Sequence, residues 1–315
     1  MAKRKVLYTR NPIYVFYTLG SVIAFTIVAL IAGRPTLGAL ERAAFELFYR
    51  LPNFLTPLAV ATTLLGTLVV PIVLSIGYVI KRRSDVALRI FSSALFASIT
   101  AQLLSNLVNR PLPISFLNSV TERASLPITS FPSNYAAVSL AVAITLANYL
   151  PRGYRKWTTL AFALVGGAQI YLGLSLPLDV IAGWLVGVFS YSVVALVFGS
   201  RYIPVSAERL ARKLSAAGLE GTTLKPAAVD ARGSVPFFGE YKNGKIFVKV
   251  FNQDNNAADW LFKVMRRIQY RRLEDEVPSL TPKRTIEHEA YLTMLATYKA
   301  KVRVPEFLGI YRVGN

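Results

Sequence analysis

The stretch "IYLGLSLPLDVIAGWLVG" at residues 170–187 decides the fold, because it is apolar over almost its whole length. A helix needs about 20 such residues to cross the hydrocarbon core of a bilayer. One acid, Asp179, interrupts the apolar run. A carboxylate is costly in this setting and is usually kept because it has a partner or a function. The stretch therefore predicts a membrane helix that carries a polar site.

Composition extends this prediction to the first two thirds of the chain. The 315 residues are 53% hydrophobic, and of the 17 acids only five lie in residues 1–200, while the other twelve lie in residues 201–315. The order indicates a membrane part followed by a soluble part. The chain has no cysteine, which excludes disulfides and cysteine-ligated metals, and its single histidine is His288.

Six apolar stretches are long enough, or nearly so, to span a membrane. They lie at about 12–33, 54–80, 86–108, 132–150, 157–174 and 178–199.

Basic clusters occupy alternate connections between these stretches, at residues 3–5, 81–83 and 152–156 and again after residue 201. Because Lys and Arg stay on the cytoplasmic side, both ends are expected in the cytoplasm of a multi-pass cell-membrane protein. The net charge of +19 then reflects topology and contact with anionic lipid. We expect a membrane lipid as partner, and no nucleic acid.

The connections expected on the outer side are residues 34–53, 109–131 and 175–177. The first contains "TLGALERAAFELFYRL", whose apolar residues recur at helical spacing. This pattern predicts a helix that lies at the membrane interface.

The pattern changes after the sixth stretch. "SAERLARKLSAAG" predicts a basic amphipathic helix that Ser206 caps and Gly218 ends, either hugging the membrane or solvated. "FFGEYKNGKIFVKVF" predicts two strands joined at Asn243–Gly244. Helices are expected at 255–272 and 285–299, and a further strand at 303–313.

The sequence therefore predicts an all-α bundle of six transmembrane helices followed by a small cytoplasmic α+β domain. Residues 1–53 would hold the first transmembrane helix and the outer interfacial helix, and residues 54–200 the membrane core. Residues 201–224 would form a basic amphipathic linker, and residues 225–315 the soluble lobe.

Three segments are expected to face the outer side together: "NRPLP" at 109–113, "FPSNYAA" at 131–137 and "AQIYLGLSLPLDVIAGW" at 168–184. Their order and spacing resemble those of the motifs of the type-2 phosphatidic acid phosphatases, or lipid phosphate phosphatases, and the resemblance covers about residues 55–200. The resemblance implies phosphoryl transfer through a phosphohistidine. In that family a Lys and two Arg bind the phosphate, an Asp orients the nucleophilic His, and a second His protonates the leaving oxygen.

Arg110, Ser133 and Asp179 match this pattern, but the other motif positions depart from it. The changed positions are Leu103 in place of Lys, Asn134 in place of Gly, Tyr135 in place of the acid His, Ala168 and Gln169 in place of Ser-Arg, and Ser175 in place of the nucleophilic His. A phosphohistidine cannot form at this site, because residues 1–200 contain no histidine. The resemblance therefore implies a catalytically degenerate member.

Three roles stay open for the retained residues. Arg110 and Asp179 can form a structural intramembrane ion pair. Alternatively, Arg110, Ser133, Asn134 and Gln169 can bind a lipid phosphate, such as a polyprenyl phosphate, without hydrolysing it. A third hypothesis is an active phosphatase in which Ser175 attacks with Asp179 as its base, or in which Asp179 activates a water molecule. No metal or cofactor is expected in any of the three.

"KNGKIFVKVF" and the later "EHEAYLTML" resemble the start of the small lobe of protein-kinase-like folds. The resemblance implies that Lys249 pairs with Glu289, with Glu287 as second choice. The alternative without a functional role is a small α+β domain with a surface ion pair. His-Arg-Asp and Asp-Phe-Gly motifs are missing, so a partial lobe without a catalytic loop is expected. In one hypothesis the membrane bundle serves only as an anchor for this lobe. The resemblance further implies a fragment of a longer protein, with more kinase-like and flippase-like domains beyond.

Overall fold

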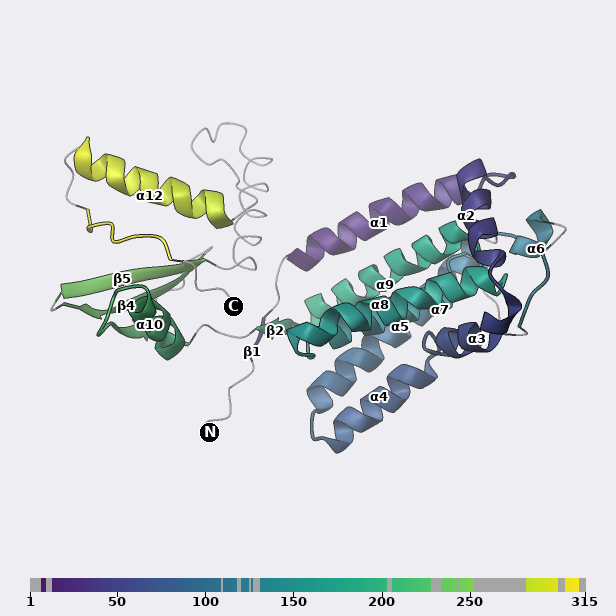
Figure 1. The fold of residues 1–315 in the computed structure, drawn as a ribbon, viewed down its shortest axis with the longest axis horizontal. Coiled ribbons are helices and arrows are strands. Elements are labelled where there is room, and N and C mark those ends of the chain that lie inside the picture. The colour runs from purple at the N-terminus through teal and green to yellow at the C-terminus, as the bar shows by residue number, and fades with distance from the viewer. Residues whose placement is uncertain are drawn as a thin grey trace. The chain divides into compact units, whose positions relative to one another are not determined.

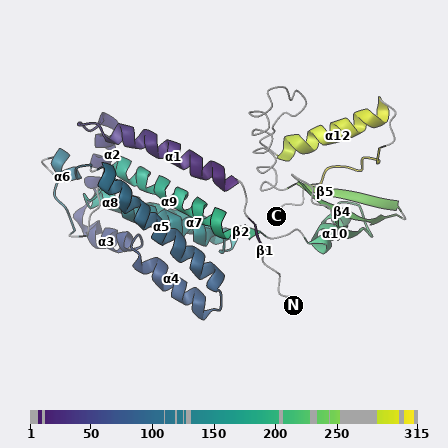
Figure 2. The ribbon, with the colours of Figure 1, turned by 180° about the vertical axis from the view of Figure 1, so that it is seen from behind.

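A computed structural model describes residues 7–9, 13–108, 110–117, 120–124, 126, 131–202, 206–227, 234–242, 244–251, 282–299 and 304–311. The chain divides into two compact units, one of Tyr14–Ser200 and one of Met1–Ile13 with Arg201–Asn315. The first is helical and the second combines a small sheet with helices, as Figures 1 and 2 show from opposite sides. We call them the membrane unit and the sheet unit.

The membrane unit is built from helices in every one of the six predicted apolar stretches. Its elements are α1 (Ile13–Ala32), α2 (Ala39–Tyr49), η1 (Asn53–Leu55), α3 (Thr56–Leu64), α4 (Val69–Ile80), α5 (Ser84–Val108), α6 (Pro113–Phe116), α7 (Asn134–Ala147), α8 (Arg152–Tyr171) and α9 (Pro177–Phe198). The helix predicted within the first outer connection is α2. Between α5 and α7 the described residues contain only the four-residue α6, as expected of a segment rich in proline.

Three helical segments are long and apolar enough to cross a bilayer. They are α1, the segment that begins with α5, and α9, and the pair α3–α4 adds a fourth if its 51° bend is counted as one broken span. At 14 residues, α7 is shorter than a full span requires. The helices thus indicate a membrane protein, while the number of six spans stays a prediction.

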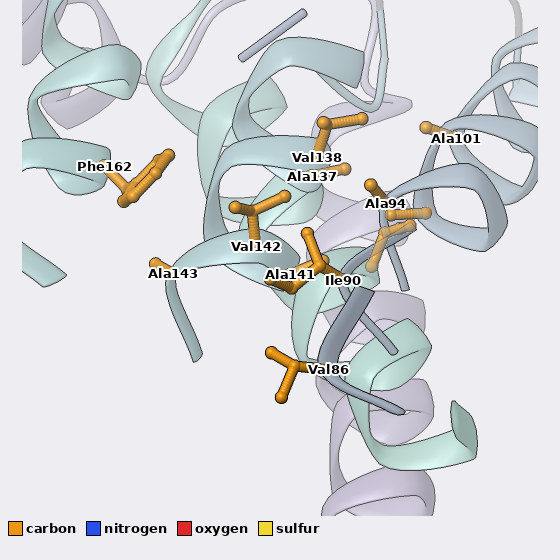
Figure 3. Packing of buried hydrophobic residues seen from close by; sticks show 12 residues of the cluster. Val86, Ile90, Ala94, Ala101, Ala137, Val138, Ala141, Val142, Ala143 and Phe162 are labelled. Atoms are coloured by element: carbon orange, nitrogen blue, oxygen red, sulfur yellow. The ribbon is translucent and has the colours of Figure 1, made fainter. Parts of the chain in front are cut away.

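Small residues let the central helices α5, α7 and α9 approach closely. Figure 3 shows part of this core, with Ala94 and Ala101 of α5 near Ala137 and Ala141 of α7. On α9, a Cβ added to Gly187 would lie 2.7 Å from the carbonyl oxygen of Ala137. Helices in membranes associate largely through such close packing, because lipid removes the hydrophobic drive between them.

The described residues of the sheet unit form two small sheets and two helices. Its elements are β1 (Leu7–Thr9), β2 (Ser200–Tyr202), α10 (Ala207–Ala216), β3 (Thr223–Pro226), β4 (Ser234–Tyr241), β5 (Gly244–Phe251) and α12 (Pro282–Tyr298). Strands β1 and β2 form a two-stranded sheet, and the order of the second sheet is β3-β4-β5. The predicted hairpin is confirmed, with Tyr241 opposite Gly244 in the register of β4 and β5.

Helix α10, in the segment 201–224 expected as a linker, lies in the sheet unit. The Ser206 hydroxyl accepts a hydrogen bond from the Arg209 N–H and caps the helix, as predicted. Leu210 and Leu214 are buried in one cluster with Phe237 of β4. The apolar face of the amphipathic helix is therefore covered by the sheet. The expected boundary at residue 225 also falls inside β3.

Two other predictions for the soluble part have different outcomes. The helix expected at 285–299 is confirmed as α12, whereas the one expected at 255–272 lies outside the described residues. The strand expected at 303–313 is wrong over residues 304–311, which form no regular element. Pro305 there has no N–H to donate, and Gly309 has φ +146°.

Candidate functional site

Arg110 lies at the centre of a group of three charged side chains. Its Nη1 donates to Asp179 Oδ1 at 2.6 Å and to Glu41 Oε1 at 3.1 Å, and its Nη2 donates to Glu41 Oε2 at 2.9 Å. Glu41 comes from α2, Arg110 follows α5, and Asp179 is in the first turn of α9. One guanidinium therefore holds two carboxylates, one of them bidentately. We call these residues the Arg110 triad.

The triad is almost completely shielded from solvent. The side chains of Arg110, Glu41 and Asp179 are 3%, 7% and 1% exposed. Buried charges are tolerated only where partners and further hydrogen bonds satisfy them. Here the backbone N–H of Leu178 donates to Glu41 Oε1 at 3.2 Å, and that of Leu176 donates to Asp179 Oδ2 at 2.8 Å. Both amides lie where α9 begins, at the helix end that favours negative charge.

The sequence "LPLD" fixes Asp179 in this position. Leu176 is the N-cap of α9, Pro177 follows at a position where a missing N–H costs nothing, and the Asp179 carboxylate receives the N-cap N–H. The carbonyl of Asp179 also accepts from the Ser133 N–H at 2.9 Å, which joins the starts of α7 and α9. The second and third motifs thus meet through the backbone.

Gln169 gathers the hydroxyl groups of the site. Its Oε1 accepts from Ser133 Oγ at 3.3 Å and from Ser175 Oγ at 3.1 Å. Ser133 Oγ also accepts from the Ala136 N–H and caps α7. Among the described residues, no hydrogen bond joins Ser175 to Asp179. The Ser175 hydroxyl therefore donates to a neutral amide and has no carboxylate to take its proton.

Two nitrogen donors of the site are buried without a partner among the described residues. They are Arg110 Nε and Gln169 Nε2, on residues that are 6% and 2% exposed. A buried donor left unpaired costs about 1–3 kcal/mol. Such donors are satisfied by an oxygen acceptor, which a water molecule or a ligand can supply.

The family model of the PAP2 superfamily matches residues 86–202, which include most of this site. These residues form a PAP2 superfamily domain. The domain includes Arg110, Ser133 and Asp179 but begins after Glu41, which the structure adds to the site from α2.

Individual relatives agree with the match. The chain is 27% identical over 110 residues to an undecaprenyl-diphosphatase of Sulfolobus acidocaldarius, an overlap of 35% of this chain and 53% of the relative. The chain thus spans about half the length of this curated relative.

Two solved structures are also similar. The crystal structure of Aquifex aeolicus LpxE shares 25% identity, covers 50% of this chain and 95% of that one, and has a TM-score of 0.46. The phosphatidylglycerolphosphate phosphatase of Bacillus subtilis shares 19% identity, covers 57% and 94%, and has the same TM-score of 0.46.

The positions predicted from the sequence to depart from the family motifs lie in different surroundings. Leu103 is exposed on α5, and Ala168 is buried among apolar residues beside Leu172. Asn134 and Tyr135 form the first turn of α7, and the backbone of Tyr135 lies against Gly66. Gln169 and Ser175, two of these positions, are hydrogen-bonded to each other.

Glu41 is the site residue that sequence reasoning missed. A signal was present, because Glu41 is one of only five acids in residues 1–200. On the same helix, Glu46 pairs with Arg42 and Arg50 through exposed contacts four residues apart. No basic residue lies three or four positions from Glu41, which was compatible with a distant cation as its partner.

The sheet unit brings together the two residues named for the kinase-like resemblance. Lys249 Nζ of β5 lies 3.1 Å and 3.2 Å from the two carboxylate oxygens of Glu289 on α12. Glu287, the second choice, lies 3.6 Å from Lys283 instead. The Lys249 and Glu289 side chains are 39% and 45% exposed, so this pair contributes little to stability.

Over the described ranges, no group of three or more His, Asp or Glu residues is arranged to hold a metal ion.

Proposed function

We propose that the membrane unit is a non-hydrolysing PAP2 domain that binds the head group of a lipid phosphate, with polyprenyl phosphates as the first class to test. The observation that carries the proposal is the state of the former nucleophile position, where Ser175 donates to the amide of Gln169. The site keeps the elements that hold an oxyanion and lacks those that transfer a phosphoryl group.

Several features argue against hydrolysis. A serine nucleophile needs a base that accepts its proton, and Asp179 is instead hydrogen-bonded to Arg110 and to the Leu176 N–H. The position of the family's acid His holds Tyr135. Arg110 is neutralised by two carboxylates, so little positive charge remains to stabilise a transition state.

Other features support binding. Arg110 Nε and Gln169 Nε2 are buried donors that need an oxygen acceptor, and phosphate oxygens fit that need. The apolar helices place the PAP2 domain in a membrane, where a phosphate is attached to a lipid tail. The name of the Sulfolobus acidocaldarius relative makes polyprenyl lipids the natural probes.

The test measures phosphate release and binding on the same detergent-purified chain, with undecaprenyl phosphate and diphosphate. We expect the original chain to release no more phosphate than the Asp179→Asn and Ser175→Ala variants do. We also expect the original chain to bind these lipids saturably. Gln169→Leu, which removes a buried donor, should weaken binding about five- to tenfold. Gln102→Leu, an exposed change on α5, is the matched control and should bind like the original chain.

Either half of this test can overturn the proposal. Phosphate release that Asp179→Asn abolishes would establish the rival function, an active membrane phosphatase. An absence of saturable binding would leave the Arg110 triad as a structural feature alone.

A second candidate function is that of a membrane anchor for a kinase-like domain on the cytoplasmic side. The observation in its favour is the pair between Lys249 of β5 and Glu289 of α12. In kinase-like folds such a Lys contacts the phosphates of ATP. The Lys and Arg distribution of the connections supports the cytoplasmic placement and both termini on that side.

The anchor hypothesis makes a separate prediction on MgATP. If the sheet unit is kinase-like, the full chain binds MgATP and Lys249→Ala weakens binding at least about tenfold. Lys245→Ala, an exposed change on the same strand, should leave binding unchanged. Equal binding in both variants, or none in the original chain, would identify Lys249–Glu289 as a plain surface ion pair.

A further inference from the structure

The carboxylate of Glu41 already occupies an anion-binding position. It accepts from Nη1 and Nη2 of Arg110 and from the Leu178 N–H where α9 begins. Two parallel guanidinium N–H groups and a helix N-terminal amide form a set of donors that suits a phosphate equally well. In this structure the acceptor is a side chain of the same protein.

Glu41 comes from outside the matched PAP2 domain. That domain begins at residue 86, whereas Glu41 lies in the first turn of α2. The helix is held at its other end, where Phe45 is buried and the hydroxyl of Tyr49 accepts from the Thr121 N–H at 3.0 Å. A separate element thus delivers a carboxylate to the arginine of the first motif.

The charge of the triad opposes a second anion. With Glu41 ionised, one guanidinium faces two carboxylates, and an incoming phosphate meets net negative charge. Without the Glu41 carboxylate, Arg110 and Asp179 form a neutral pair. Arg110 Nη2 and the Leu178 N–H then become available, next to the unpartnered Arg110 Nε.

We propose that Glu41 is an intramolecular competitor for the lipid phosphate site. Its carboxylate takes the position of the phosphate oxygens, and lipid phosphate binds when Glu41 leaves Arg110. This inference rests on the proposed lipid phosphate binding. In it, α2 is the element that closes the site.

The experiment compares Glu41→Gln with the original chain by titrating farnesyl phosphate into detergent-solubilised protein. The amide keeps the shape of Glu41 but removes its charge, so farnesyl phosphate should bind about tenfold tighter or more. Glu46→Gln, the same change on the same helix in an exposed pair, should bind like the original chain. Inorganic phosphate is titrated in parallel to separate the head group from the lipid tail.

The outcomes separate the inference from the function beneath it. Equal binding by Glu41→Gln and the original chain overturns the competitor role and leaves lipid phosphate binding intact. No binding by any variant overturns both. If only the original chain binds and Glu41→Gln remains folded, Glu41 supports the site and the inference is wrong.

A second measurement keeps the inference testable if Glu41→Gln fails to fold. Because the chain has no cysteine, Glu46→Cys provides a single labelling position on α2. Saturating farnesyl phosphate should change the fluorescence of a polarity-sensitive label there as Glu41 leaves the site. A label whose spectrum does not change at saturation shows that α2 stays in place, which overturns the competitor role.

Discussion

Arg110→Ala is expected to lower the free energy of unfolding of the membrane unit by about 3–5 kcal/mol. In the variant, the carboxylates of Glu41 and Asp179 stay buried close to each other but lose the guanidinium that they share. Burial penalises each charge, and the two repel each other. Unfolding of the purified protein in a mixed detergent titration, followed by circular dichroism, measures the loss.

Two controls identify the cause of this loss. Arg42→Ala removes the same side chain from the exposed pair with Glu46 and should cost less than about 1 kcal/mol. Combining Arg110→Met with Glu41→Gln and Asp179→Asn removes all three charges and should recover most of the stability. If Arg110→Ala is no more harmful than Arg42→Ala, the buried triad does not contribute to the fold as described.

Gly187→Ala is expected to lower the free energy of unfolding by about 1–3 kcal/mol, although alanine is the better helix former. The added Cβ would lie 2.7 Å from the carbonyl oxygen of Ala137 and 3.1 Å from the Cβ of Leu140. Both contacts are shorter than van der Waals packing allows, so α7 and α9 must separate. The same detergent titration measures the effect.

Gly77→Ala on α4 is the matched control, since no atom lies within 4 Å of its added Cβ. It should be neutral or stabilising by up to about 1 kcal/mol. Equal effects of the two substitutions would show that α7 and α9 do not depend on the close approach at Gly187. The comparison separates helix–helix packing from helix propensity.

The Arg110 triad bears on both the structural and the functional hypotheses for the site. The sequence suggested Arg110 and Asp179 either as an intramembrane ion pair or as parts of a phosphate pocket. The structure joins the two residues at 2.6 Å and adds Glu41. The arrangement is compatible with a structural ion pair and with a phosphate pocket, because the donors that hold Glu41 are those that a phosphate would use.

Much of the architecture could be predicted from local pattern. Apolar stretches of about 20 residues predicted the helices, and turn and capping residues predicted the hairpin and α10. These features depend on neighbours in the chain. The strand expected at 303–313 failed for the opposite reason: a strand needs a partner that supplies hydrogen bonds, and residues 304–311 form no ladder.

By itself, the sequence determined the chemistry that the membrane unit lacks. Residues 1–200 contain no histidine, and no fold can supply an imidazole that the chain does not encode there. Only the tertiary structure decided how the remaining charges are used. Arg110 and Glu41 are 69 positions apart, and local spacing says nothing about a contact that depends on the packing of α2 beside α9. Burial then makes this contact strong, because a charge removed from water needs a partner wherever the fold provides one.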